Sequence, residues 1–285
     1  MNDYAGEMVL QDNLKVLRLP TMLREYVACS RAAIENNSSH VDFLRTLTTV
    51  EVQERATKRI RQRISEAQFP ALKTLDTFAM NKAPGLNSHI VRELAESKFI
   101  GLAENVILIG KSGTGKTHFA TAIAIEACRR NYRVRFSTAC KLVTDLLEAR
   151  EDYRLKQLME RLKRFDLLVL DELGYVPFSK AGAELLFQIL ADRYEKSATI
   201  ITTNLPFPQW TDVFGEATLT AALLDRITHH CQILEFNWNS IRLEESTKKH
   251  QSIPIHIGTA RPKKPDGKKE ATEETKIEKE KSPNN

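Results

Sequence analysis

The chain has 285 residues, of which 42% are hydrophobic and 28% are charged, and its formal net charge is +5. These proportions are typical of a globular protein that buries a core, and they exclude a wholly disordered chain. The positive charge permits a polyanionic partner without requiring one, because the position of the basic residues matters more than their sum.

The cysteines and the apolar runs bear on the cellular setting. The four cysteines form no C-x-x-C pair and have no zinc-site spacing, so we expect reduced thiols. The amino terminus lacks the basic and apolar segments of a signal peptide, and the apolar runs fall short of membrane-spanning length. The sequence therefore predicts a cytoplasmic protein without a membrane partner.

Residues 1–95 have the apolar spacing of helices. The longest predicted helix is polar and runs from about Val41 to Ala67. The pair Phe69-Pro70 ends it, because the residue before a proline disfavours helix. We predict a small all-helical amino-terminal domain over residues 1–95 that binds DNA or another partner.

Basic residues cluster on this long helix. Arg55, Arg59 and Arg63 recur every four residues and form one stripe, with Lys58 beside it. Such a stripe can contact DNA phosphates without reading bases. The alternative is a solvated face paired with neighbouring carboxylates, and the residue pattern leaves both open. The neighbouring acidic residues are Glu51, Glu54 and Glu66.

Residues 96–245 alternate apolar runs with helical patterns. This alternation predicts an α/β domain with a parallel sheet covered on both faces. The run before Asp171 is apolar throughout, as expected for a central strand buried on both sides. The predicted strands are Asn105–Ile109, Arg133–Ser137, Leu167–Leu170, Thr199–Thr203 and Gln232–Glu235.

The first of these strands runs into the sequence G-x-x-x-x-G-K-T, and a helical pattern follows. This order is typical of a phosphate-binding loop, whose glycines turn backbone N–H groups toward phosphate oxygens. Lys116 can reach the β- and γ-phosphates of ATP, and the Thr117 hydroxyl can hold Mg²⁺. The predicted nucleotide-binding residues are Gly110, Lys111, Ser112, Gly113, Thr114, Gly115, Lys116, Thr117 and His118.

Two adjacent carboxylates, Asp171 and Glu172, follow the central strand. Asp171 can support a Mg²⁺ ion together with Thr117. Glu172 is placed to polarise an attacking water as a general base. A second carboxylate at this position favours ATP hydrolysis over phosphate transfer to a small-molecule hydroxyl.

Two further residues are candidates for catalysis. Asn204 stands at the tip of the strand after Asp171 and can reach between the γ-phosphate and a water, although an asparagine there is also a common turn residue. Arg226 lies on a helical pattern and suits a phosphate in transfer. The alternative for Arg226 is a surface ion pair with Asp225.

Two adjacent histidines, His229 and His230, follow Arg226. Neighbouring residues on a helix point about 100° apart, so we expect no shared metal ion there. Mg²⁺ is the one metal that the sequence predicts.

Residues 246–285 have no aromatic residue and are dense in lysine, glutamate, threonine and proline. Such a segment cannot bury enough apolar surface to order itself. We predict a disordered tail, and its mixed charges favour a solvated segment over a DNA-binding arm.

The ordered set GKSGTGKTH, LLVLDE, TIITTN, LLDRI and FNWNSIR resembles the AAA+ ATPases of the initiator and helicase-loader branch. It is most similar to the IstB family, the ATP-binding helpers of insertion-sequence transposases, and the DnaC helicase loaders are related. The likeness covers about residues 10–245. Its specificity comes from the order of the motifs, because each motif alone is common.

The resemblance implies a fold and a set of roles. The family sheet has the order 5-1-4-3-2, with ATP between subunits and a reduced or absent carboxy-terminal lid. Glu172 would be the catalytic base, Asn204 the first sensor, and Arg226 a finger that acts on a neighbouring subunit's ATP. Arg242 matches the second sensor, although the family has an aromatic residue where this chain has Ile241.

The motifs and the resemblance together predict a DNA-binding ATPase. We expect a homo-oligomer that assembles on duplex DNA with ATP and Mg²⁺ and assists a transposase in target selection. One alternative is a DnaC-like loader of a replicative helicase. Another is an ATP-dependent interaction switch that does not hydrolyse, against which Glu172 argues.

Overall fold

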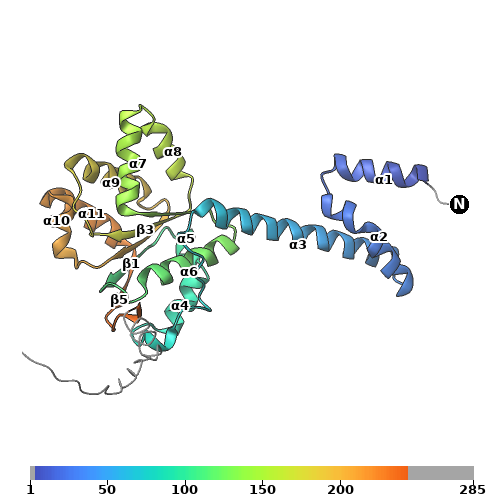
Figure 1. Ribbon diagram of the computed structural model, residues 1–285, viewed down its shortest axis with the longest axis horizontal. Helices are drawn as coiled ribbons and strands as arrows, with labels where there is room; N and C mark the ends of the chain where they lie inside the picture. The colour runs from blue at the N-terminus through green and yellow to red at the C-terminus, as the bar shows by residue number, and fades with distance from the viewer. Residues whose placement is uncertain (1–3, 243–285) are drawn as a thin grey trace, which may run out of the picture.

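The computed structural model describes residues 4–242. Figure 1 shows an α/β body from which a long helix leads to two shorter helices. The predicted tail, residues 246–285, lies outside the described residues, and so does the place of the expected reduced lid. Of the helices within residues 4–242, none combines the length and the apolarity that a bilayer crossing requires.

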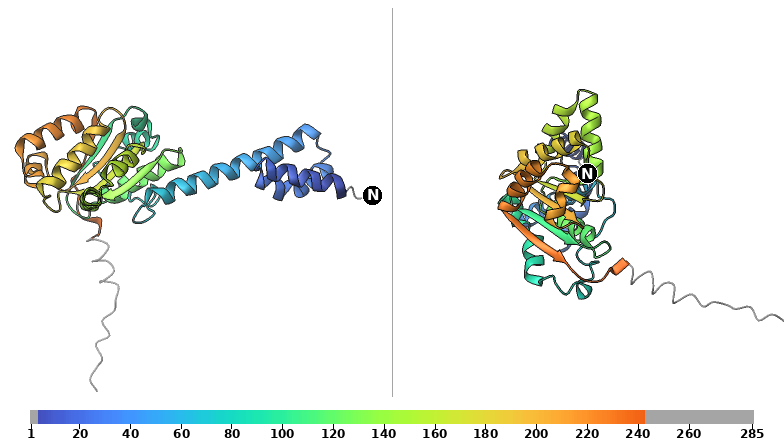
Figure 2. Two further views of the ribbon diagram at one scale, coloured as in Figure 1. Left: turned by 90° about the horizontal axis from the view of Figure 1, so that it is seen from above. Right: turned by 90° about the vertical axis from the view of Figure 1, so that its left-hand side faces the viewer.

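The amino-terminal region consists of α1 (Tyr4–Val16), α2 (Pro20–Glu35) and α3 (His40–Ala67). The Ser39 side chain caps α3 by accepting a hydrogen bond from the Asp42 N–H. The 28 residues of α3 span about 42 Å at the usual rise, and Figure 2 shows α1 and α2 packed at the end of α3 away from the body. The predicted long helix is thus confirmed.

Three short helices connect α3 to the sheet: η1 (Met80–Lys82), α4 (Ser88–Ala95) and α5 (Lys98–Gly101). Buried side chains of this connection belong to the same apolar cluster as residues of the sheet. The boundary at residue 95 between two domains stays a prediction. The buried side chains of the connection are Phe78, Ala83, Leu86, Leu94, Phe99 and Ile100.

The body contains one five-stranded parallel sheet in the order β2-β3-β4-β1-β5. This is the predicted order read from the opposite edge. Each predicted strand is present, with limits that shift by one to three residues. The strands are β1 (Asn105–Gly110), β2 (Val134–Thr138), β3 (Leu167–Leu173), β4 (Ala198–Thr203) and β5 (Cys231–Phe236).

Helices cover both faces of the sheet, because the strands bury apolar side chains on both sides. One cluster places α6 (Lys116–Arg129), α4 and the end of α3 against one face. The second cluster covers the other face with five helices. These are α7 (Ala139–Glu151), α8 (Leu155–Lys163), α9 (Lys180–Arg193), α10 (Trp210–Phe214) and α11 (Ala217–His229), with η2 (Phe207–Gln209) before α10.

The parallel strands bring their carboxyl ends to one edge of the sheet. The glycine-rich loop follows β1, and the two acidic residues lie near the carboxyl end of β3, on the other side of β4. Crevices at this edge are where open α/β sheets bind ligands.

Candidate functional site

The loop between β1 and α6 has the backbone of a phosphate cradle. Gly113 and Gly115 have φ values of +80° and +98°, which side chains other than glycine rarely adopt. A Cβ atom on Gly113 would also stand 2.1 Å from the Ser240 Oγ. Because α6 begins at Lys116, the unpaired N–H groups of its first turn lie at the end of the loop and favour an anion.

Lys116 turns back onto this loop. Its side chain is 7% exposed, and Nζ donates to the carbonyl oxygens of Gly110 (2.6 Å) and Lys111 (2.8 Å). Burial lowers the pKa of Lys116 to about 8, against a smaller opposing effect of Asp171. A phosphate would supply the negative charge that carbonyl groups lack, so the site favours an anionic ligand.

Three oxygen-bearing side chains meet beside the loop. The hydroxyls of Thr117 and Thr202 donate to Oδ1 of Asp171 at 3.0 and 2.5 Å, and Asp171 is buried. Hydroxyl and carboxylate oxygens are the ligands that Mg²⁺ prefers. The predicted pair, Thr117 and Asp171, is therefore in contact.

Thr202 is a residue that the sequence reasoning missed. It lies near the carboxyl end of β4, the strand beside the one that carries Asp171. The available signal was its hydroxyl near the end of a predicted strand, and the pairing of β4 with β3 decides what that hydroxyl contacts.

Glu172 occupies an irregularity of β3. The register between β3 and β4 shifts between Leu170 and Leu173, and Glu172 has a φ of +59°. Its N–H donates to the Thr202 Oγ1 at 3.0 Å. Such a bulge re-aims a side chain, and the exposed Glu172 lines the cleft next to the loop.

Lys116, Thr117, Glu172 and Thr202 line a cleft of about 280 Å³. Its wall contains most of the predicted nucleotide-binding residues and several that were not predicted. The predicted nucleotide-binding residues in the wall are Ser112, Gly113, Gly115, Lys116, Thr117 and His118, and the predicted catalytic residues Glu172 and Arg242 also line it. The others are Lys73, Thr77, Phe78, Ala79, Tyr175, Thr202 and Ile241.

The segment between α3 and η1 closes one side of the cleft. The His118 Nε2 lies 3.2 Å from the Thr77 Oγ1 and 3.1 Å from the Thr74 carbonyl oxygen. The Phe78 ring packs edge-on against His118, with 5.3 Å between ring centres. No local sequence pattern marks this segment, because it reaches the cleft only through tertiary contacts.

The segment after β5 lies against the phosphate loop. The Trp238 Nε1 donates to the Thr114 carbonyl oxygen, and the Ile241 N–H donates to the Gly113 carbonyl oxygen, both at 3.0 Å. Arg242 follows and lines the cleft. The segment that resembles the second-sensor motif is thus next to the loop, while the role of Arg242 stays a prediction.

Asn204 and Arg226 are not among the described residues that line this cleft. Asn204 is exposed just beyond the end of β4. Arg226 is half-buried on α11, with its guanidinium 5.3 Å from the centre of the Phe187 ring and Nη1 donating to the Ala222 carbonyl oxygen at 2.9 Å. Their roles stay predictions.

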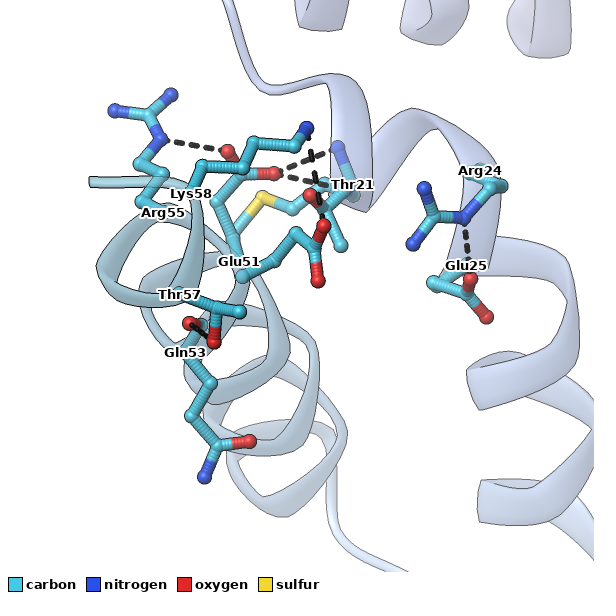
Figure 3. A network of polar contacts seen from close by, with 10 residues as sticks. Thr21, Arg24, Glu25, Glu51, Gln53, Arg55, Thr57 and Lys58 are labelled. Atoms are coloured by element: carbon cyan, nitrogen blue, oxygen red, sulfur yellow. Dashed lines mark hydrogen bonds and ion pairs between the residues drawn. The ribbon is translucent and has the colours of Figure 1, made fainter. Parts of the chain in front are cut away.

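The basic stripe on α3 is divided between structural contacts and exposed charge. Figure 3 shows Arg55 bonded to the buried Glu51, whose other oxygen accepts from the N–H groups of Thr21 and Met22 at the start of α2. The Arg55 guanidinium also donates to the Arg18 carbonyl oxygen. Arg55 therefore takes part in packing α2 on α3.

The other three members of the stripe differ in exposure. Arg63 is partly buried and contacts Glu66 and Asn131. Lys58 and Arg59 are exposed, and Lys58 lies 3.9 Å from Glu54. The stripe thus presents its most accessible charge at Lys58 and Arg59.

The assumption that His229 and His230 are both helical is wrong. α11 ends at His229, and His230 has the non-helical φ and ψ of −126° and 84°. Their ring centres are 4.1 Å apart, so the geometric objection to a shared ligand does not hold.

Comparison with known proteins agrees with the site. The family model of the IstB-like ATP-binding proteins matches residues 12–249. The IS21 putative ATP-binding protein of Pseudomonas aeruginosa is 36% identical over 216 residues, which cover 76% of this chain and 82% of the relative. The IS5376 putative ATP-binding protein of Geobacillus stearothermophilus is 35% identical over 229 residues, covering 80% and 91%.

A solved structure supports the fold. AMPPCP-bound DnaA from Aquifex aeolicus matches with a TM-score of 0.52 and 23% identity, over 67% of this chain and 58% of that chain. At this identity the match concerns the fold alone. The family match over most of the chain, with the phosphate loop at the carboxyl ends of the strands, shows that this chain belongs to the family of IstB-like ATP-binding proteins.

Proposed function

We propose that the protein hydrolyses ATP, assembles as a homo-oligomer on duplex DNA, and assists a transposase in choosing its target. The observation that supports this most is the convergence of Lys116, Thr117 and the Glu172 carboxylate on one cleft, with the buried Asp171 bonded to Thr117. Its relatives are named as insertion-sequence proteins, and no helix among the described residues is long and apolar enough to cross a membrane. We propose a cytoplasmic location.

Hydrolysis would use side chains already at the cleft. Lys116 would exchange its two carbonyl partners for phosphate oxygens. The Glu172 carboxylate would take a proton from a water molecule while the oxygen of that water bonds to the γ-phosphorus of ATP. The bond between the γ-phosphorus and the ADP oxygen breaks in the same step. Asn204 at the end of β4 would orient that water, and Arg242 would contact the phosphates.

A Mg²⁺ ion would fit the oxygen atoms of Thr117 and Asp171, which are 3.0 Å apart. When bound, it would supply positive charge that offsets the negative charge of the ATP phosphates. The chain's part is to hold the Asp171 carboxylate buried and oriented, which the hydroxyl of Thr202 supports at 2.5 Å.

Assembly would depend on Arg226. This guanidinium lies outside the cleft described for its own chain, so it would act on ATP held by a neighbouring subunit. Arginine fingers of this kind raise rates by roughly 10³ to 10⁵. ATP between two subunits would then couple nucleotide binding to oligomer formation.

Contact with DNA would use the stripe of Arg55, Lys58, Arg59 and Arg63. Lys58 and Arg59 would supply most of it, because they are exposed. Each subunit would add a few weak phosphate contacts, and the oligomer would combine them into stable binding.

Phosphate release with and without duplex DNA tests this proposal. We expect DNA to stimulate release and Glu172→Gln to lower it by roughly 10²- to 10⁴-fold. Arg226→Ala should also be inactive, and mixing it with Glu172→Gln should restore release, because the first supplies an intact cleft and the second an intact finger. If Arg226→Ala alone kept full activity, Arg226 would not be an arginine finger.

The DNA contact has its own test. Lys58→Ala and Arg59→Ala together should weaken duplex binding and reduce its salt dependence, whereas Lys15→Ala on α1 should leave both unchanged. If the double variant bound duplex DNA as tightly as Lys15→Ala does, the stripe would not be the DNA contact.

Two alternatives are distinguished by partner and by turnover. A helicase loader would bind a replicative helicase in preference to a transposase, and the insertion-sequence names of the relatives favour the transposase. A switch that does not hydrolyse would bind ATP without releasing phosphate. Co-purification with each partner and the release assay separate the three.

A further inference from the structure

Glu195, His229 and His230 meet at the edge of the sheet opposite the ATP cleft. Glu195 lies between α9 and β4, His229 is the last residue of α11, and His230 lies between α11 and β5. The His230 carbonyl oxygen accepts a hydrogen bond from the Asn105 N–H at 2.8 Å, where β1 begins. The cluster is thus at the amino ends of the strands and separate from the nucleotide site.

The ends of two helices, α9 and α11, bring these side chains together. After α9, Glu195 adopts a left-handed φ of +57°, which turns the chain toward β4. After α11, His230 leaves the helical conformation, and its ring comes to 4.1 Å from that of His229. The juxtaposition therefore follows from where the two helices stop.

The three side chains offer ligands of one chemical kind. A ring nitrogen of each histidine and a carboxylate oxygen of Glu195 all lie within 4.8 Å of one another. Ligands of a tetrahedral zinc ion stand about 3.4 Å apart, given metal–ligand bonds of about 2.0–2.1 Å. All three side chains are exposed, so small rotations can close this difference without disturbing the core.

The surroundings support a cation. The Tyr194 hydroxyl lies 2.8 Å from the His229 Nδ1, which is the kind of outer contact that orients metal-binding histidines.

We propose that Glu195, His229 and His230 bind a divalent transition-metal ion of the zinc class. Two imidazoles and one carboxylate are a common zinc ligand set, and they leave a fourth position for water or another group. The ion would join the end of α9 to the end of α11. Arg226 is on the last turn of α11, so the metal would also fix the backbone that carries this arginine.

Metal binding by the full chain without a histidine tag tests this. Zn²⁺ affinity is measured by competition with a chromophoric chelator, in the presence of excess Mg²⁺, and Co²⁺ absorbance reports the ligand geometry. We expect one tight site per chain, and a loss of at least tenfold in affinity for each of Glu195→Gln, His229→Ala and His230→Ala. Zn²⁺ should raise the melting temperature of the parent and not of these variants.

Two controls make the result specific. His89→Ala removes an exposed histidine that has its own carboxylate neighbour, Glu93, at 4.0 Å. The double change of His250 and His256 to alanine removes the histidines outside the described residues. Both should bind Zn²⁺ like the parent.

The proposal is overturned if the three cluster variants keep the parent's affinity, or if the His250 and His256 change abolishes binding. The cluster would then be an exposed pair of His229 and Glu195, which lie 3.9 Å apart. Melting temperatures measured in chelator show that each variant is folded, so a lost affinity is assigned to the ligand and not to unfolding.

Discussion

The amino-terminal helices and the α/β body are held together in different ways. In α1 to α3 the buried apolar cluster consists of Leu14, Met22 and Leu47. The body has two large clusters, one on each face of its sheet. Tyr4 and Val16 in the amino-terminal region are 71% and 80% exposed.

This difference shows how a small region can be ordered with little apolar burial. Glu51 reaches from α3 to the start of α2 and bonds two backbone N–H groups and Arg55. The carboxylate satisfies orphan donors that a helix start would otherwise leave unpaired. Hydrogen bonds of a buried carboxylate thus help to hold the amino-terminal helices together, whereas apolar packing holds the body together.

The two regions can be followed separately by spectroscopy. Both tryptophans, Trp210 and Trp238, are in the body, so their fluorescence reports the body alone. Far-ultraviolet circular dichroism reports the helices of both regions. A change made in one region should therefore shift one signal more than the other.

The largest effect is expected from Arg193→Met in the body. Arg193 is 3% exposed and donates to carbonyl oxygens of Leu162, Phe165 and Ala198. Removing the guanidinium leaves these acceptors unsatisfied, and the free energy of unfolding should fall by roughly 3–5 kcal/mol. Urea unfolding followed by tryptophan fluorescence measures this.

The exposed Lys196→Met serves as the control for Arg193. A loss for Arg193→Met no greater than for this control would contradict the view that the buried guanidinium joins α8, the segment before β3, and β4.

The next largest effect is the pH dependence of the body's stability that Lys116 causes. Burial lowers its pKa to about 8 from the ordinary 10.5, so between these values the unfolded chain binds one more proton than the folded chain. The body's stability should therefore rise with pH in this window, by about 1.4 kcal/mol per unit, and be lowest below pH 8. Lys116→Met should abolish this rise and ATP binding together.

The matched control for Lys116 is Lys111→Met, which changes an exposed lysine of the same loop. A rise of equal slope in Lys116→Met would assign the pH dependence to another group.

Glu51→Gln addresses the amino-terminal region. Burial raises the pKa of Glu51, but the hydrogen bonds from Met22, Arg55 and Thr21 outweigh it, and the pKa is below 4.5. The stabilisation is therefore present above about pH 4.5 and lost as pH falls through the folded pKa. At pH 7 the variant should lose roughly 1–3 kcal/mol, seen by circular dichroism more than by tryptophan fluorescence.

Glu54→Gln is the control for Glu51, because Glu54 makes only a distant pair with Lys58 at 3.9 Å. An equal shift of the tryptophan transition in Glu51→Gln would show that the two regions unfold as one unit.

The smallest effect concerns the packing of Arg226 in the body. Phe187→Leu removes the ring over which this guanidinium lies. A cation–π contact is worth about 0.5–2 kcal/mol, so we expect DNA-stimulated phosphate release to fall by roughly 2- to 30-fold. Phe187→Tyr keeps the ring and should retain activity.

Comparing Phe187→Leu with Arg226→Ala separates a wrong role for Arg226 from a wrong role for the ring beside it. If Arg226→Ala is active, the finger itself is wrong. If Arg226→Ala is inactive and Phe187→Leu is fully active, the ring does not position the arginine.

The sequence by itself determined the elements whose signal is local. The glycine spacing of the phosphate loop, the apolar run before Asp171 and the alternation of strands and helices each depend on residues close together in the chain. They predicted the five strands and the contact of Thr117 with Asp171, while the strand order came from the family resemblance of the ordered motifs. The carboxyl ends of parallel strands share an edge, so this contact followed from the topology.

The tertiary structure alone decided which distant segments reach the same place. It put Thr202 on Asp171, the Thr77–Phe78 segment against His118, and Trp238 over the loop. It also engaged Arg55 in packing α2 and brought the histidine rings together. Contacts between residues far apart in the chain depend on where helices end and how strands pair, and no local pattern encodes these.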